Sequence, residues 1–157
     1  MTGRSSDSTV RRFQPGDGPD VRRVHRDALR VEGTDPEDVP GNQDLRWIEE
    51  TYFRSGGTFL VAEDNGQIVA CGGLLVGGET AELMRIAVDP AHQRSGYGTA
   101  ILDDLEACAE SQGCVRVVLT TARRQQAATA FYPARGYELV GTRRVNGYTL
   151  LEYEKQL

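Results

Sequence analysis

The sequence predicts one α/β domain whose central sheet is mixed, mostly antiparallel and made of about seven strands, with about four flanking helices. Its 157 residues suit a single hydrophobic core. Strand-like and helix-like segments follow in the order β, α, α, β, β, β, α, β, α, β, β. A strand, a helix and a strand over residues 81–122 require a parallel crossover. We expect residues 1–157 to form this one domain, with residues 1–8 as a disordered arm.

Two helices are expected to follow the first strand. Residues 9–13 alternate like a strand, and Asp20 is placed as the N-cap of a helix within residues 15–30. The segment 31–43 predicts a loop. A second apolar stripe predicts another helix over residues 44–55, which two glycines end.

The rest of the chain predicts most of the sheet. Asn-Gly pairs at residues 65–66 and 146–147 predict hairpins, because both central residues of a type I′ turn need positive φ. The run over residues 81–88 is apolar on both faces, which is typical of a strand in the sheet centre. The other expected elements are a helix that ends at Gly113, a strand over residues 114–121 and a helix from Arg124 that Pro133 should end or kink.

Composition and residue spacing argue against several classes of protein. With 23 acidic residues, 18 basic residues and a net charge of -5, a broad nucleic-acid surface is not expected. The absence of a signal-like start and of a long apolar run predicts a cytoplasmic protein without a membrane partner. The cysteines lack Cys-x-x-Cys spacing, and His25 and His92 lack metal-ligand spacing, so neither a disulfide framework nor a metal is expected. Both histidines are expected at the surface or in loops.

The stretch "DPAHQRSGYGTAILDD", residues 89–104, places two glycines between a strand and a helix. Unpaired amides and the positive dipole end of a helix N-terminus suit a pyrophosphate, and glycine lets the backbone approach closely. A P-loop would need GxxxxGK[ST], and this loop has no lysine. A dinucleotide fingerprint would need a third glycine where Ile101 stands and an acid about twenty residues further on. Taken alone, the loop leaves a plain tight turn as the alternative.

Two spaced motifs resemble those of a known family. "LMRIAVDPAHQRSGYGTAIL" resembles the cofactor-binding motif of the GNAT superfamily, the acetyl-CoA-dependent N-acetyltransferases, with Gln93, Gly96 and Gly98 on its (Q/R)xxGx(G/A) core. "QQAATAFYPARGYELVG" resembles that family's second motif. The resemblance covers residues 9–155 and implies the GNAT fold, acetyl-CoA as cosubstrate and no metal. It also implies acetyl transfer to a primary amine of a small molecule or peptide, by direct attack in a ternary complex.

The resemblance implies which residues bind the cofactor. The backbone of Ile86, Ala87 and Val88 corresponds to the strand that binds the pantetheine arm, and Gln125 stands where the family often has an asparagine beside the cofactor. The pyrophosphate is assigned to Gln93, Arg94, Ser95, Gly96, Tyr97, Gly98 and Thr99. The sequence departs from the family at Arg94, where many members have glycine, and at Pro133, which is unusual after the tyrosine.

Two catalytic residues are also implied by the resemblance. Glu82 matches the catalytic glutamate of histone-type members, and a solvated glutamate at a strand edge is the alternative. A base is needed because a lysine-like amine with a pKa of about 10.4 is neutral in roughly one molecule in 10³ at pH 7.4. Tyr132 matches the family tyrosine near the cofactor sulfur, where it would act as the general acid, and a core aromatic is the alternative. A backbone N–H of residues 86–88 is expected to meet the carbonyl oxygen that gains charge.

The acceptor site is the least specified part of the expectation. In the family the N-terminal helices and their loop wall this site, which points here to Trp47, Tyr52 and the acidic residues 32–41. An acidic wall would favour a cationic acceptor, while a solvated loop and core aromatics are the alternatives. Self-association is common in the family, so a homodimer is compatible with the resemblance. Two other functions stay open at this point: a non-catalytic acyl-CoA-binding regulatory domain and a nucleotide-binding module.

Overall fold

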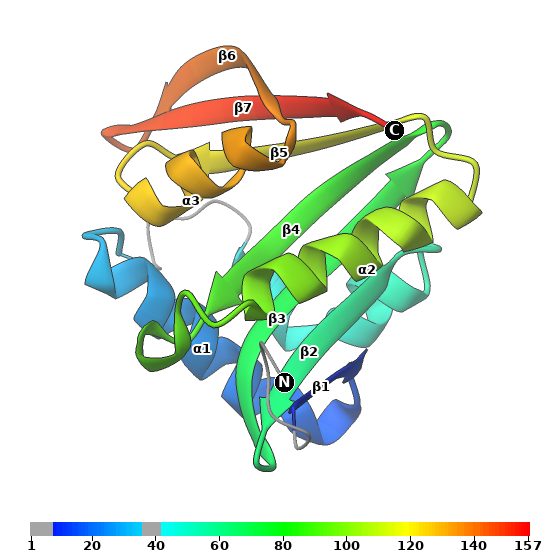
Figure 1. Cartoon of the computed structure of the whole chain (residues 1–157), viewed down its shortest axis with the longest axis vertical. Helices are drawn as coiled ribbons and strands as arrows, with labels where there is room; N and C mark the ends of the chain where they lie inside the picture. Colours follow the sequence, from blue (N-terminus) through cyan, green and yellow to red (C-terminus); the bar gives the residue numbers. More distant parts are fainter. Residues whose placement is uncertain (1–7, 36–41) are drawn as a thin grey trace.

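The computed structural model describes residues 8–35 and 42–157, so nearly all of the expected N-terminal arm and part of the acidic loop lie outside the described residues. Within them, one sheet of seven strands has the order β1-β2-β3-β4-β5-β7-β6. Neighbouring strands are antiparallel except β4 and β5, which are parallel (Figure 1). The strands are β1 (Ser8–Arg12), β2 (Thr58–Asp64), β3 (Gln67–Gly77), β4 (Thr80–Val88), β5 (Arg116–Ala122), β6 (Glu138–Val145) and β7 (Tyr148–Gln156). This mixed, mostly antiparallel sheet confirms the predicted fold class.

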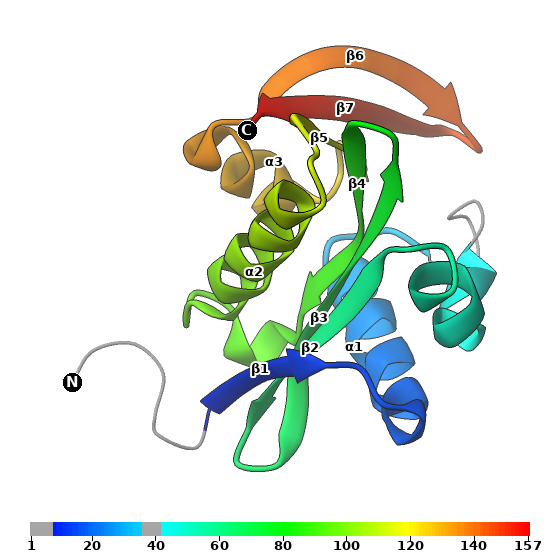
Figure 2. The ribbon, with the colours of Figure 1, turned by 90° about the vertical axis from the view of Figure 1, so that its right-hand side faces the viewer.

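Helices cover both faces of the sheet (Figure 2). One buried cluster joins α2 to the sheet through Ile101 and Leu105, and a second joins α1 through Val21 and Val24. The helices are α1 (Gly18–Val31), α2 (Tyr97–Ser111) and α3 (Gln126–Phe131), with short turns η1 (Pro15–Asp17), η3 (Asn42–Arg46), η4 (Glu49–Phe53), η5 (Pro90–His92) and η6 (Pro133–Arg135). Among the described helices, none is long and apolar enough to cross a membrane.

Two local expectations differ from the structure. Helix α1 begins at Gly18, so Asp20 lies in its first turn rather than at the N-cap; Pro19 fits that turn because it has no N–H to leave unpaired. The helix expected over residues 44–55 is replaced by the 3₁₀ turn η3 and the π turn η4. Its apolar stripe is buried as expected, but Asp44 accepts hydrogen bonds from Tyr52 and Arg85, and these tertiary bonds override the helical propensity of the segment.

An irregularity in β4 shapes the centre of the molecule. The register of β3 with β4 shifts between Cys71 and Gly73, and the facing Arg85 has a φ of 57°. Met84 packs with the cluster under α1, and Arg85 reaches η3 on that same face, whereas Ile86 packs with the cluster under α2. In a regular strand, consecutive side chains would alternate, so this β-bulge turns two neighbours to one face.

Strands β4 and β5 separate along their length. Their parallel pairing joins residues 80–82 with residues 116–118, and beyond it the strands diverge (Figure 1). The divergence therefore opens space in the middle of an otherwise continuous sheet.

Candidate active site

Two hollows lie where β4 and β5 separate. We call the first the loop cleft: it has a volume of about 700 Å³ and lies between the end of β4, the glycine loop and α3. The second, the inner cavity, has a volume of about 280 Å³ and lies between α1, β4, β5 and the β6–β7 hairpin. The residues that border both hollows are Ala28, Ile86, Ala87, Gln125, Ala128 and Tyr132. The two hollows thus share a wall.

The glycine loop presents backbone amides to the loop cleft. Gly96, with a φ of 88°, is the N-cap of α2, and the bond from the amide of Ala100 to the carbonyl of Gly96, 3.0 Å long, begins the helical ladder. The amides of residues 97–99 therefore precede the ladder and point out of the helix end. Arg94 has a φ of 64°, a left-handed conformation that favours glycine and accounts for the glycine common at this position in the family that the loop resembles.

Most of the predicted cofactor residues border the loop cleft. These are Ile86, Ala87, Val88, Gln93, Arg94, Gly96, Gly98, Thr99 and Gln125. Ser95 is exposed outside the lining, and the side chain of Tyr97 is buried in the cluster beneath α2. At Tyr97, any contact with a ligand in the cleft would thus have to come from the backbone.

Glu82 and Tyr132, the predicted catalytic pair, both border the inner cavity. Tyr132 borders the loop cleft as well and is 5% exposed, with edge-on aromatic contacts to Phe131 and Tyr137 at 5.1 and 5.5 Å between ring centroids. Burial raises the pKa of Tyr132 above its usual value, so its hydroxyl stays protonated at neutral pH. Glu82 is half-buried on β4.

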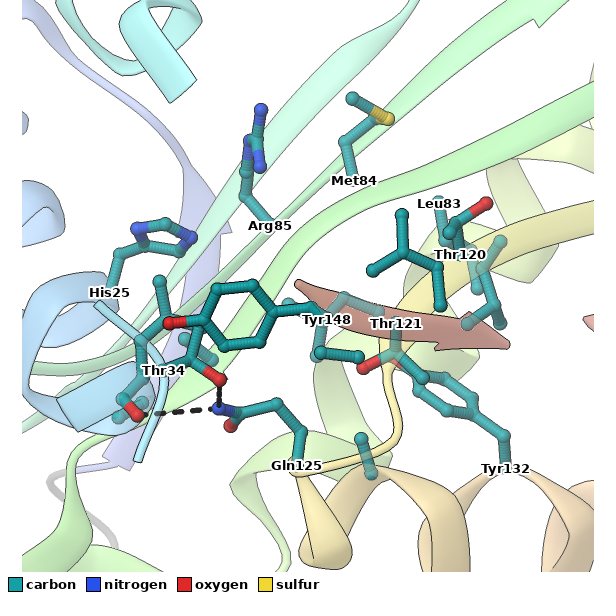
Figure 3. A pocket seen from close by; sticks show the side chains of 18 of the residues that line it. His25, Thr34, Leu83, Met84, Arg85, Thr120, Thr121, Gln125, Tyr132 and Tyr148 are labelled. Carbon is teal, nitrogen blue, oxygen red and sulfur yellow. Dashed lines mark hydrogen bonds between the residues drawn. The ribbon is translucent and has the colours of Figure 1, made fainter. Parts of the chain in front are cut away.

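The end of α1 is joined to the start of α3 across the shared wall. The side-chain amide of Gln125 donates to the hydroxyl of Thr34 at 2.6 Å and to the carbonyl of Leu29 at 3.2 Å (Figure 3). The backbone amide of Ala127 donates to the carboxylate of Glu32 at 3.1 Å. Gln125 therefore borders both hollows and joins α1 to the start of α3 at their shared wall.

Several site residues escaped the sequence analysis. In the loop cleft, the guanidinium of Arg135 donates to Thr99 at 2.7 Å and to the carbonyl of Phe131 at 3.0 Å, which ties η6 to the first turn of α2. In the inner cavity they are His25, Thr34, Met84, Arg85, Thr120, Thr121 and Tyr148 (Figure 3). His25 was expected at the surface or in a loop, and this is wrong: it is 6% exposed on α1. Its place on the helical stripe of Val21 and Val24 could have revealed this.

The residues that were expected to form the wall of the acceptor site are only partly found beside the inner cavity. Trp47 is 60% exposed, and Tyr52 is fully buried in the cluster under α1; within the described residues, neither borders the inner cavity. Tyr52 acts indirectly, because its hydroxyl bonds to Asp44, which pairs with Arg85 at 3.1 Å in the cavity wall. Residues 36–41 of the acidic loop lie outside the described residues.

A mixed sheet that splays beside a glycine loop and a helix N-terminus defines the acyl-CoA N-acyltransferase class of folds. A model of the acetyltransferase (GNAT) family matches residues 20–137. The chain belongs to the acetyltransferase (GNAT) family.

Individual relatives agree with this assignment. N-acetyltransferase family 8 member 2 of Rattus norvegicus is 31% identical over 104 residues, which cover 62% of this chain and 46% of the relative. The chain thus spans about half the length of the curated relatives it matches first. An acetyltransferase structure from Streptococcus agalactiae superposes with a TM-score of 0.85 at 19% identity, covering 98% of this chain and 100% of that one. The PaiA N-acetyltransferase of Thermoplasma acidophilum, solved in complex with coenzyme A, has a TM-score of 0.75 at 19% identity. The match covers 96% of this chain and 99% of that one.

Proposed function

We propose that the protein transfers an acetyl group from acetyl-CoA to a primary amine of a small molecule or peptide, with both substrates bound together. The observation that carries this proposal is the shared wall of the two hollows. An open cleft with a phosphate-binding loop meets a smaller cavity with a carboxylate, and Tyr132 stands at their junction. Direct attack requires such a meeting point, because the reacting atoms must come within about 3–3.5 Å of each other.

The chemistry of the loop cleft fits the phosphates of acetyl-CoA. The amides of residues 97–99 and the dipole of α2 attract anions, and Arg94 adds a cation at the cleft. A Cβ added at Gly96 would meet no atom within 4 Å, so the backbone there is open to a ligand. The Thermoplasma relative, solved with coenzyme A, supports the same cofactor here.

Glu82 is proposed to receive the proton of the attacking amine. Acetyl-CoA supplies the acetyl group as a thioester whose leaving thiolate has a pKa of about 8.5. The amine contributes more to the barrier than the leaving thiolate does, because little of it is neutral at neutral pH. Forming the neutral amine costs about 4 kcal/mol. Glu82 removes the proton, directly or through a water, as the new C–N bond forms and the C–S bond breaks.

Tyr132 and the backbone of β4 are proposed to stabilise the charges that develop. The buried hydroxyl of Tyr132 is protonated when the thioester binds, and it gives its proton to the departing sulfur as the C–S bond breaks. A backbone N–H of residues 86–88, beside the same junction, would donate to the carbonyl oxygen as it gains charge. The site thus supplies a base, a donor for the leaving group and an oxyanion donor around one point.

The test is acetyl-CoA-dependent release of free thiol in the presence of a panel of amines. We expect amine-dependent release, acetylated product by mass spectrometry, and initial rates that intersect when both substrates are varied. The variant Glu82→Gln should lower kcat by roughly 10² to 10⁴-fold. The matched control Glu79→Gln changes an exposed glutamate next to the same strand and should retain wild-type kcat.

Two experimental results would contradict the proposed function. A folded protein that binds acetyl-CoA but releases no thiol with any amine would contradict acetyl transfer and favour a non-catalytic acyl-CoA-binding domain. Parallel initial-rate lines would contradict direct attack in a ternary complex.

A further inference from the structure

We propose that His25 selects the acceptor, by hydrogen bonding to an uncharged polar group at the end of a small amine remote from its nitrogen. The proposal rests on the proposed function and narrows its substrate to small primary amines that carry a hydroxyl or a similar neutral group. His25 is a specificity-determining residue in this scheme and takes no part in proton transfer to or from the reacting amine.

Tyr132, which is proposed to take part in acetyl transfer, and His25, which is proposed to recognise the acceptor, lie at opposite ends of the inner cavity. Figure 3 shows Thr120 and Tyr132 at one end of the inner cavity and His25 with Arg85 at the other. Glu82 precedes Arg85 by three positions on β4. An amine that places its nitrogen near Glu82 and Tyr132 therefore extends its other end toward His25.

The imidazole of His25 is available to form a hydrogen bond to a ligand in the inner cavity. It is 6% exposed and borders the inner cavity, and within the described residues its ring makes no hydrogen bond to the protein. A ligand that displaces water from this ring without bonding to it leaves a polar group unsatisfied, which is unfavourable. A ligand atom that bonds to this ring is therefore favoured over an apolar atom that only displaces water.

The charges around His25 favour an uncharged partner. Arg85 is paired with Asp44 at 3.1 Å, and each side chain is 10% exposed, so the two charges cancel at this end of the cavity. Burial and the neighbouring Arg85 lower the pKa of His25 to about 4, so the ring is neutral at physiological pH. Among the residues that the structure describes at this end of the cavity, a second ammonium or a carboxylate would lose its hydration without meeting an unbalanced opposite charge.

The size of the cavity favours a small acceptor. Its volume of about 280 Å³ lies near the lower end of the roughly 300–1,000 Å³ that is typical of small-molecule pockets. The bonds from Gln125 to Thr34 and Leu29 hold α1 against the start of α3 on the side of the loop cleft. A short amine with one polar end matches this space.

The experiment compares matched amines that differ only at the remote end. The probes are 5-aminopentan-1-ol, hexylamine, 1,5-diaminopentane and 5-aminopentanoate, together with the shorter set 3-aminopropan-1-ol, butylamine, 1,3-diaminopropane and 3-aminopropanoate. In at least one set, the wild type should show a kcat/KM for the amino alcohol roughly 10-fold above that for the alkylamine. His25→Leu should bring this ratio close to one, and His25→Gln, which keeps a donor and an acceptor, should preserve much of it. His92→Leu, a histidine outside the cavity, should retain the wild-type ratio, and melting temperatures show that each variant is folded.

Three results would overturn the inference. Equal kcat/KM values for alcohol and alkylamine in the wild type would do so, as would a preference for the diamine or the amino acid. An alcohol preference that His25→Leu leaves unchanged would assign recognition to another residue. Failure of the proposed function looks different, because then no amine is acetylated at all by folded protein that binds acetyl-CoA.

Discussion

Tyr132 and Glu82 lie on different elements, and the structure brings them to one cavity by different means. Tyr132 follows α3 and is fixed by aromatic neighbours, whereas Glu82 lies on β4 at the last pair of its parallel pairing with β5. The sequence motifs could locate both residues, because each lies at a fixed offset from a recognisable pattern. His25 and Arg85 could not be found this way, since their approach depends on the bulge in β4 and on the packing of α1.

Replacing Tyr132 by phenylalanine should lower kcat roughly 10 to 10²-fold, at or below the usual range for a general acid. The ring and its packing remain, so the melting temperature should change little. The matched control is Tyr137→Phe, which loses a hydrogen bond to Glu106 at 2.6 Å and should cost about 1 kcal/mol of stability without a comparable loss of kcat. Steady-state kinetics and thermal unfolding of both variants separate the two effects. Unchanged turnover in Tyr132→Phe would exclude the proposed role.

At the scale of elements, the strand pattern and the two hairpins could be predicted, because alternation and Asn-Gly turns are local signals. Asn65 and Asn146 have φ values of 53° and 51°, as type I′ turns require. The short turns η3 and η4 could not be predicted, because Asp44 is held by Arg85, a residue far along the chain. The bulge escaped prediction for the same reason, since it depends on the pairing of β3 with β4.

Gly96→Ala should destabilise the glycine loop. Its φ of 88° is costly for a residue with a Cβ, and since open space surrounds that position the cost is conformational, about 1 kcal/mol. The distorted amides should also weaken acetyl-CoA binding. Gly77→Ala, also in open space but without a positive φ, serves as control and should change neither property much. Equal unfolding free energies and equal acetyl-CoA affinities for the two variants would contradict the loop's role.

Helix α1 should make the protein sensitive to acid through His25. The pKa of His25 is lowered from 6.5 to about 4 in the folded state, so between these values the unfolded chain binds a proton that the folded chain does not. Stability should therefore fall as the pH drops through this window, by about 2–3 kcal/mol at pH 4.5 relative to pH 7.5 from this group. Denaturant unfolding of the wild type and His25→Gln at both pH values measures it. A wild type that loses no more stability than the variant would contradict a buried neutral histidine.

At the scale of the whole molecule, the sheet order, the divergence of β4 from β5 and the glycine loop together produce two hollows with a shared wall. The loop and the strand that carries it were predictable from one motif. The inner cavity was not, because its walls come from α1, β4, β5 and the β6–β7 hairpin, which are far apart in the sequence.

Acetyl-CoA should stabilise the protein against unfolding, and NAD should not. A ligand at 100 times its Kd adds about 2.7 kcal/mol to the free energy of unfolding. Thermal unfolding with each ligand measures this directly. Stabilisation by NAD alone would indicate a dinucleotide-binding module and contradict the assignment of the loop cleft.

We propose that the acyl donor and the amine meet where the loop cleft and the inner cavity share lining residues. A crystal structure of the protein with coenzyme A tests it most directly. We expect the pyrophosphate on the amides of residues 97–99, the pantetheine arm along residues 86–88 and the sulfur next to Tyr132, facing the inner cavity. A sulfur that points away from Tyr132, or phosphates bound elsewhere than the glycine loop, would contradict it.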